Sequence, residues 1–156
     1  MSYDPRRLLG TLAGSEVDAV LMGGLGGAVR GSPLVSIGVE VCHSRSARNL
    51  DALARVLADL GARLRGGDAA LDTAALATVD TFRVDTDAGP LDCIGTPRGT
   101  TGYADIARRS EVVDLGGFGF RVASLDDLIR MKRAAGHPRD RAELEVLEAL
   151  REEVAT

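Results

Sequence analysis

The chain has 156 residues, a net charge of −4 and only 3% aromatic residues. This length suits one domain with its own core. The acidic balance argues against attachment to nucleic acid by bulk charge, and the few rings argue against a stacking platform for single strands. The sequence contains neither an apolar run of about 18 residues nor a signal-peptide core, so we expect a single cytoplasmic domain over residues 1–156.

The first part of the chain alternates short helices and strands. Asp4 and Pro5 form a helix start, because Asp caps free N–H groups and Pro suits the first helical position. Apolar residues alternate with others from Val35 to Val41, which is typical of a half-buried strand. These patterns predict helices over 5–13, 25–30 and 46–60, and strands over 17–22 and 35–41.

The second part of the chain contains two hairpin signals. Asp87-Ala88-Gly89-Pro90 is the turn of the first hairpin, and Gly116-Gly117 is the turn of the second. Residues 62–70 are interpreted as a loop or a short edge strand. The patterns predict strands over 81–87, 91–94, 112–115 and 118–123, and helices over 71–77, 103–109, 124–135 and 138–153. The irregular order predicts an α/β protein, with a mixed sheet and helices packed on it.

One segment has a layout suited to phosphate and metal chemistry. Gly23 and Gly24 follow a strand and precede a helix, so backbone N–H groups could approach a triphosphate. On the next strand Ser36, Gly38 and Glu40 share one face, where acidic groups could hold divalent cations. Only Glu40 is acidic, however. The pattern alone therefore favours the simpler interpretation, a turn followed by an edge strand with a solvated Glu.

Several segments together resemble a known family. Residues 22–41 (MGGLGGAVRGSPLVSIGVEV) are similar to the signature of AbiEii-like nucleotidyltransferase toxins and their minimal relatives, and residues 124–150 match the family's ending. The resemblance implies a nucleotidyltransferase fold: a mixed sheet flanked by helices, with a C-terminal helical hairpin. It also implies Mg²⁺-dependent transfer of a nucleotide monophosphate from a nucleoside triphosphate to a hydroxyl of tRNA or protein, and an antitoxin protein as partner.

The resemblance assigns roles to individual residues. Two of the family's three carboxylates fall on Glu40 and Asp92, which would be catalytic and would hold the metal. The downstream Lys and Asp fall on Lys132 and Asp140, also expected to be catalytic. Gly23, Gly24, Ser36 and Lys132 would bind the nucleotide.

The departures from the family concentrate in the chemistry. The first carboxylate falls on Gly38, so one metal ligand is missing, and Glu40 is one methylene longer than Asp. Mg²⁺ tolerates poor geometry badly, so we expect catalysis to be impaired. The alternatives are a catalytically degenerate protein that binds a nucleotide or a partner, and a structural module that oligomerises through its hairpin edges.

Other conspicuous residues have simpler interpretations. Lys132 is the only Lys beside 18 Arg, which favours a role toward phosphate, although a Lys late in a helix also suits the helix dipole. Asp140 would be favoured in a first helical turn whatever its function. Cys42 and Cys93 should face opposite ways, which argues against zinc and against a disulfide, and His43 is interpreted as a surface residue. Four arginines near the C-terminal end form a cluster that either faces an acidic ligand or partner or is simply solvated: Arg130, Arg133, Arg139 and Arg141.

Overall fold

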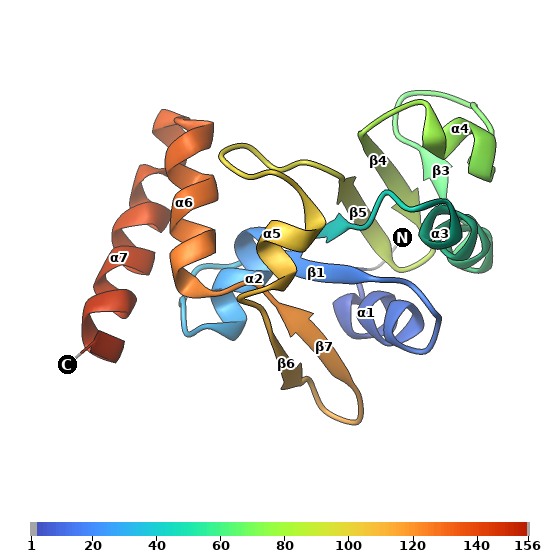
Figure 1. Cartoon of the computed structure of the whole chain (residues 1–156). Coiled ribbons are helices and arrows are strands. Elements are labelled where there is room, and N and C mark those ends of the chain that lie inside the picture. Colours follow the sequence, from blue (N-terminus) through green and yellow to red (C-terminus); the bar gives the residue numbers. More distant parts are fainter. Residues whose placement is uncertain (1–2, 156) are drawn as a thin grey trace.

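A computed structural model describes residues 3–155, so Met1, Ser2 and Thr156 of the predicted 1–156 domain lie outside the described residues. A seven-stranded sheet has the order β3-β4-β5-β2-β1-β7-β6 (Figure 1). The β2–β5 and β1–β7 pairs are parallel and the other pairs are antiparallel, so the sheet is mixed, as predicted. The strands are β1 Ala19–Met22, β2 Val39–His43, β3 Arg63–Leu64, β4 Thr81–Thr86, β5 Gly89–Ile94, β6 Glu111–Asp114 and β7 Gly119–Val122.

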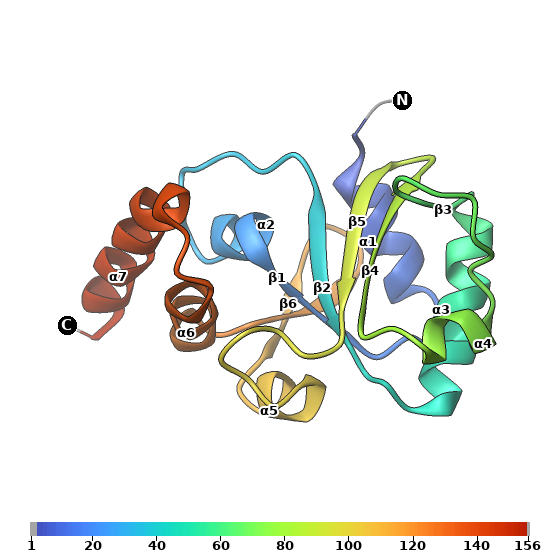
Figure 2. The ribbon, with the colours of Figure 1, turned by 90° about the horizontal axis from the view of Figure 1, so that it is seen from above.

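Helices cover both faces of the sheet (Figure 2). The first core cluster joins the sheet to α1, α3 and α4, and the second joins it to α5, α6 and α7. The antiparallel pair α6 and α7 is the expected C-terminal helical hairpin (Figure 1). The helices are α1 Pro5–Ala13, α2 Gly23–Val29, α3 Ala47–Asp59, α4 Thr73–Ala77, α5 Tyr103–Ala107, α6 Leu125–Ala135 and α7 Arg141–Ala155, with a 3₁₀ turn over Pro138–Asp140. Within residues 3–155, no helix combines the length and apolar character needed to span a bilayer.

The strand predicted over 35–41 is displaced toward the C-terminus. Its pairing with β1 ends at Met22 and Glu40, because the chain turns into α2 at Gly23 and offers no partner beyond that point. Val35 and Ile37, predicted to face the core, are 92% and 81% exposed. Ser36 therefore lies in the loop before β2, where its hydroxyl donates to the carbonyl of Gly38 at 2.8 Å.

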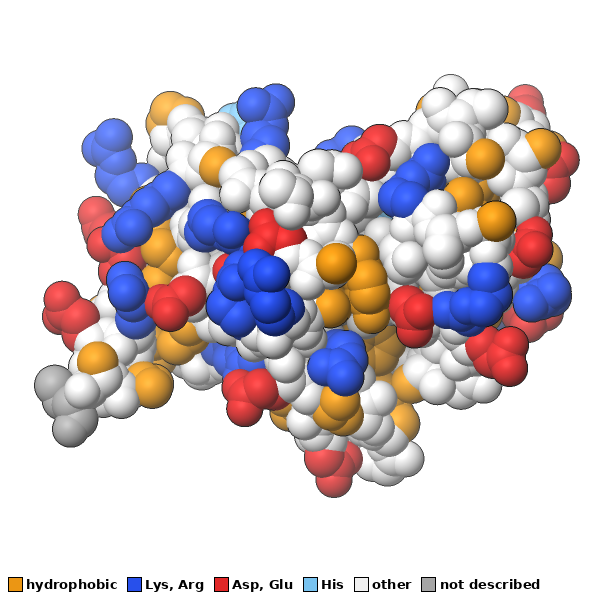
Figure 3. Space-filling view, viewed as in Figure 1, with side chains coloured by type: hydrophobic (Ala, Val, Ile, Leu, Met, Phe, Trp, Pro, Cys, Tyr) orange, Lys and Arg blue, Asp and Glu red, His pale blue; other side chains and the backbone are white. Residues whose placement is uncertain are grey.

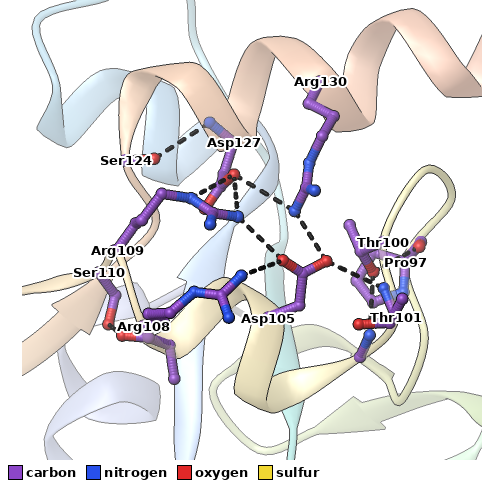
Figure 4. A network of polar contacts seen from close by, with 12 residues as sticks. Pro97, Thr100, Thr101, Asp105, Arg108, Arg109, Ser110, Ser124, Asp127 and Arg130 are labelled. Carbon is purple, nitrogen blue, oxygen red and sulfur yellow. Dashed lines mark hydrogen bonds and ion pairs between the residues drawn. The ribbon is translucent and has the colours of Figure 1, made fainter.

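A buried pair of carboxylates ties α5 to α6 (Figure 4). Asp105 and Asp127 both accept hydrogen bonds from Arg109, and both contact Arg130 at 3.0 and 3.3 Å. The backbone N–H of Thr101 and the bonded arginines hold the pKa of Asp105 well below its usual range. Arg130, predicted to face an acidic ligand or to be solvated, is thus paired within the protein.

We expect Asp127→Asn to lower the free energy of unfolding by about 2 kcal/mol, because hydrogen bonds to a charged group are lost on a buried side chain. Asp126→Asn is the matched control: Asp126 precedes Asp127 in the same helical turn and pairs with Arg151, but its side chain is 64% exposed. Exposed ion pairs contribute little, so the control should cost roughly 0.5 kcal/mol or less. Urea unfolding monitored by circular dichroism measures both. Equal losses in the two variants would contradict a structural role for this cluster.

Candidate functional site

The two predicted metal-binding carboxylates lie side by side. β2 and β5 pair in parallel with Glu40 directly opposite Asp92, so both side chains leave the same face of the sheet. Cys42 lies on this face, in the second core cluster, whereas Cys93 lies in the first cluster on the other face, as expected. The expected placement of Glu40 and Asp92 is therefore met, while their role as metal ligands stays a prediction.

Glu40 separates two hollows on this face. The larger is a cleft of about 420 Å³ between β2, β4 and the α6–α7 hairpin, and Gly23, Lys132 and Asp140 line it together with Glu40. The smaller, of about 350 Å³, lies on the other side of Glu40 and is lined by Gly24, Ser36, Gly38 and Asp92 among others. The surface is dented along the upper margin of Figure 3, between the C-terminal helices and the β3–β4 region. The predicted nucleotide-binding residues are thus divided between two adjoining hollows.

Gly23 begins α2 and does not precede it. The predicted helix of 25–30 is the seven-residue helix Gly23–Val29, so both glycines lie in its first turn. Gly23 has a φ of +66°, and a Cβ at this position would overlap the Glu40 carboxylate. A glycine is therefore required here by the backbone and by the close approach of Glu40.

Asp92 is held by arginines at both carboxylate oxygens. Arg65 Nη2 lies 3.3 Å from its Oδ1, and Arg83 Nε lies 3.3 Å from its Oδ2. Arg83 stands directly opposite Asp92 across the β4–β5 ladder, so the hairpin register places the guanidinium beside the carboxylate. The charge of Asp92 is therefore already balanced by the protein.

Glu40 stands in an environment that disfavours its charge. Burial and the neighbouring Asp92 carboxylate raise the pKa of Glu40, while the Lys132 ammonium acts in the opposite direction. A bound cation would reverse this shift by favouring the carboxylate.

Lys132 faces the cleft but already has acidic neighbours. Its Nζ lies 3.0 Å from Glu143 Oε2 on α7 and 3.6 Å from Asp140 Oδ1 in the 3₁₀ turn. The side chain is only 19% exposed, so it is not a freely solvated lysine at a helix end. Lys132 and Asp140, to which the family resemblance assigns catalytic roles, thus contact each other at one wall of the cleft.

The residues present do not fit the Mg²⁺ that the family resemblance implies. Gly38 supplies no carboxylate, and both oxygens of Asp92 are ion-paired with arginines. Within residues 3–155, no three side chains of His, Cys, Asp or Glu converge on a point that could hold a metal ion. A hard cation would have to displace Arg65 or Arg83 to reach Asp92.

Further charged residues line the cleft. Arg83 and Glu143 line it beside Glu40 and Lys132, and so do Arg98 from the loop after β5 and Arg139 from the 3₁₀ turn. No sequence pattern predicts Arg83, Arg98 or Glu143 as site residues, whereas Arg139 belongs to the arginine cluster for which an acidic ligand is one of the two predicted alternatives. The hairpin register could have identified Arg83 if the turn had been placed correctly, but no local pattern indicates that Arg98 lies near the C-terminal helices.

Comparison with known proteins supports the fold and nothing finer. A crystal structure from Thermotoga maritima, described as a "putative nucleotidyltransferase", is 15% identical and superposes with a TM-score of 0.55 over 97% of this chain and 90% of that one. The chain therefore has a nucleotidyltransferase fold. No family model matches the sequence, and no curated protein matches it.

Proposed function

We propose that the protein binds a nucleoside triphosphate in the cleft between β2 and the α6–α7 hairpin, and that nucleotide transfer is strongly impaired or lost. The observation that carries the proposal is a cleft of about 420 Å³, in a nucleotidyltransferase fold, that is lined by Glu40, Gly23 and Lys132. This volume lies within the usual range for small-molecule sites. The missing carboxylate at Gly38 and the arginine-paired Asp92 support the impairment.

A second candidate is a working nucleotidyltransferase of the AbiEii-like toxin type. Such a protein would use Mg²⁺ to transfer a nucleotide monophosphate to a hydroxyl of tRNA or protein, and an antitoxin would be its partner. The in-register pair of Glu40 and Asp92 favours it, because two carboxylates on one face can share a divalent ion with a triphosphate. Transfer of α-labelled nucleotides to bulk tRNA and to protein, at a rate typical of enzymes, would favour this candidate over the first.

Lys132→Ala tests the proposed binding site. We expect the variant to bind nucleoside triphosphates at least about tenfold more weakly, because a charged contact to phosphate is lost. Lys132→Arg keeps the charge and should recover part of the affinity. Arg55→Ala, at an exposed position of α3, which packs on the other face of the sheet, should have no effect. Calorimetric titration with each of the four common ribonucleoside triphosphates, with and without Mg²⁺, measures the affinity, and a thermal melt verifies folding. Unchanged affinity in a folded Lys132→Ala variant would contradict the proposal.

A further inference from the structure

We infer that the cleft holds a chain of phosphates through arginine side chains, without a divalent metal. The inference rests on the proposed function, because it states how the same cleft would hold a triphosphate. Three arginines from separate segments line the cleft: Arg83 on β4, Arg98 in the loop after β5 and Arg139 in the 3₁₀ turn. Guanidinium groups match the geometry of phosphate oxygens and keep their charge at any physiological pH.

Arg83 is oriented by the residue that the family resemblance makes a metal ligand. Its Nε contacts Asp92 Oδ2 at 3.3 Å, whereas its two terminal nitrogens make no hydrogen bond to any residue of 3–155. Arg83 lines the cleft, and its Nε is engaged by Asp92. Its two terminal nitrogens therefore remain available to bind an anion in the cleft. Asp92 thereby becomes a positioning residue for Arg83.

Arg98 and Arg139 carry charge that the protein does not balance locally. Both are exposed at the cleft, and neither forms an ion pair within the described part of the chain. Lys132, in contrast, is balanced by Glu143 and Asp140. The chain as a whole is acidic, with a net charge of −4, so unpaired cations gathered at one cleft point to an anionic ligand.

The same contacts that favour a phosphate disfavour a cation. A divalent ion approaching Asp92 would meet Arg65 and Arg83, which already occupy both carboxylate oxygens. A triphosphate bound by Arg83 would keep the Asp92 contact intact. In this arrangement arginines supply the positive charge that metal ions supply in two-metal phosphoryl transfer.

Calorimetry with inorganic triphosphate and with ATP and GTP, in EDTA and in excess Mg²⁺, tests this inference. We expect binding in EDTA with an affinity within about threefold of that in Mg²⁺. Arg83→Gln and Arg139→Gln should each weaken metal-free binding by about tenfold, since each removes a charged contact. Arg55→Gln, which removes the same charge from an exposed site on α3, should change the affinity by less than about twofold.

Asp92→Asn separates the arginine site from a metal site. The amide oxygen can still accept from Arg83 Nε while a negative charge beside the arginines disappears, so metal-free triphosphate should bind more tightly. If Asp92 is a metal ligand instead, Asp92→Asn should weaken triphosphate binding in Mg²⁺ and leave binding in EDTA unchanged. Either that pattern or weaker binding in EDTA would overturn the inference. Binding of ATP or GTP that requires Mg²⁺ and is weakened by Lys132→Ala would also overturn it but would leave the proposed function standing. A failure of all probes in both buffers would overturn both.

Discussion

Replacement of Gly38 by Asp together with Glu40 by Asp is expected to raise Mg²⁺ affinity and nucleotide transfer together, each by at least about tenfold. The change fits the backbone: a Cβ at residue 38 would lie 3.5 Å from the Pro90 Cβ, in ordinary contact, and Gly38 does not have a positive φ. Pro90 and Asp92 are two residues apart on β5 and therefore share a face of the sheet. A side chain at residue 38 that contacts Pro90 thus lies on the face of Glu40 and Asp92.

Two measurements and a control variant of matched shape make this prediction specific. Calorimetry gives the Mg²⁺ affinity, and transfer of α-labelled nucleotides to bulk tRNA and protein gives the activity. Gly38→Asn combined with Glu40→Asp has nearly the same shape without the added charge, so it should leave both quantities close to those of the natural protein. If the double Asp variant leaves Mg²⁺ binding unchanged, or if the natural protein already transfers at rates typical of enzymes, the impaired-site explanation is wrong.

Elements fixed by local chemistry could be predicted from the sequence. The helix α1 has the predicted bounds, because the Asp4 side chain caps it and Pro5 begins it. The helix α6 is also set locally: the Ser124 hydroxyl accepts from the Asp127 N–H at its start, and Gly136 ends it with a φ of +65°. Such signals act within a few residues and need no knowledge of the rest of the fold.

Features that depend on distant partners could not be predicted in the same way. The alternation from Val35 to Val41 favours a strand, yet no strand lies beside residues 35–38. A turn over residues 87–90 would set Arg83 opposite Ile94, whereas the hairpin pairs Thr86 with Gly89 and so places Arg83 opposite Asp92. A shift of two residues in this register thus decides whether Arg83 lies beside the Asp92 carboxylate.

His43 also departs from its predicted place, for the same reason. It lies at the end of β2 and is fully buried, with its ring 5.2 Å from that of Phe82, whereas a strand-end surface residue was expected. Arg45 Nη1 lies 3.4 Å from Nε2, and Nδ1 has no hydrogen-bond partner within residues 3–155. Its burial depends on the packing of β4 and β5 beside β2, which no local pattern reveals.

We expect the free energy of unfolding to fall in mild acid because the buried His43 resists protonation in the folded protein. Burial and the nearby Arg45 lower the pKa of His43 to about 4, against an ordinary value of 6.5, while Asp80 acts weakly in the opposite direction. Between these two values the unfolded chain binds a proton that the folded chain does not. The stability contributed by neutral His43 is therefore complete above pH 6.5 and is lost as the pH falls toward 4. The loss amounts to about 3 kcal/mol.

Urea unfolding of the natural protein and of His43→Gln, at several pH values from neutral to mildly acidic, measures this loss. The difference in free energy of unfolding between the two proteins should shrink by about 3 kcal/mol across this range. Glu40 has a raised pKa and acts with the opposite sign just above its ordinary value of 4.5, but both proteins share that contribution and it cancels in the difference. His137→Gln, at the exposed second histidine, should follow the natural protein throughout. A difference that stays constant with pH would mean that the His43 imidazole is protonated as readily in the folded protein as in water.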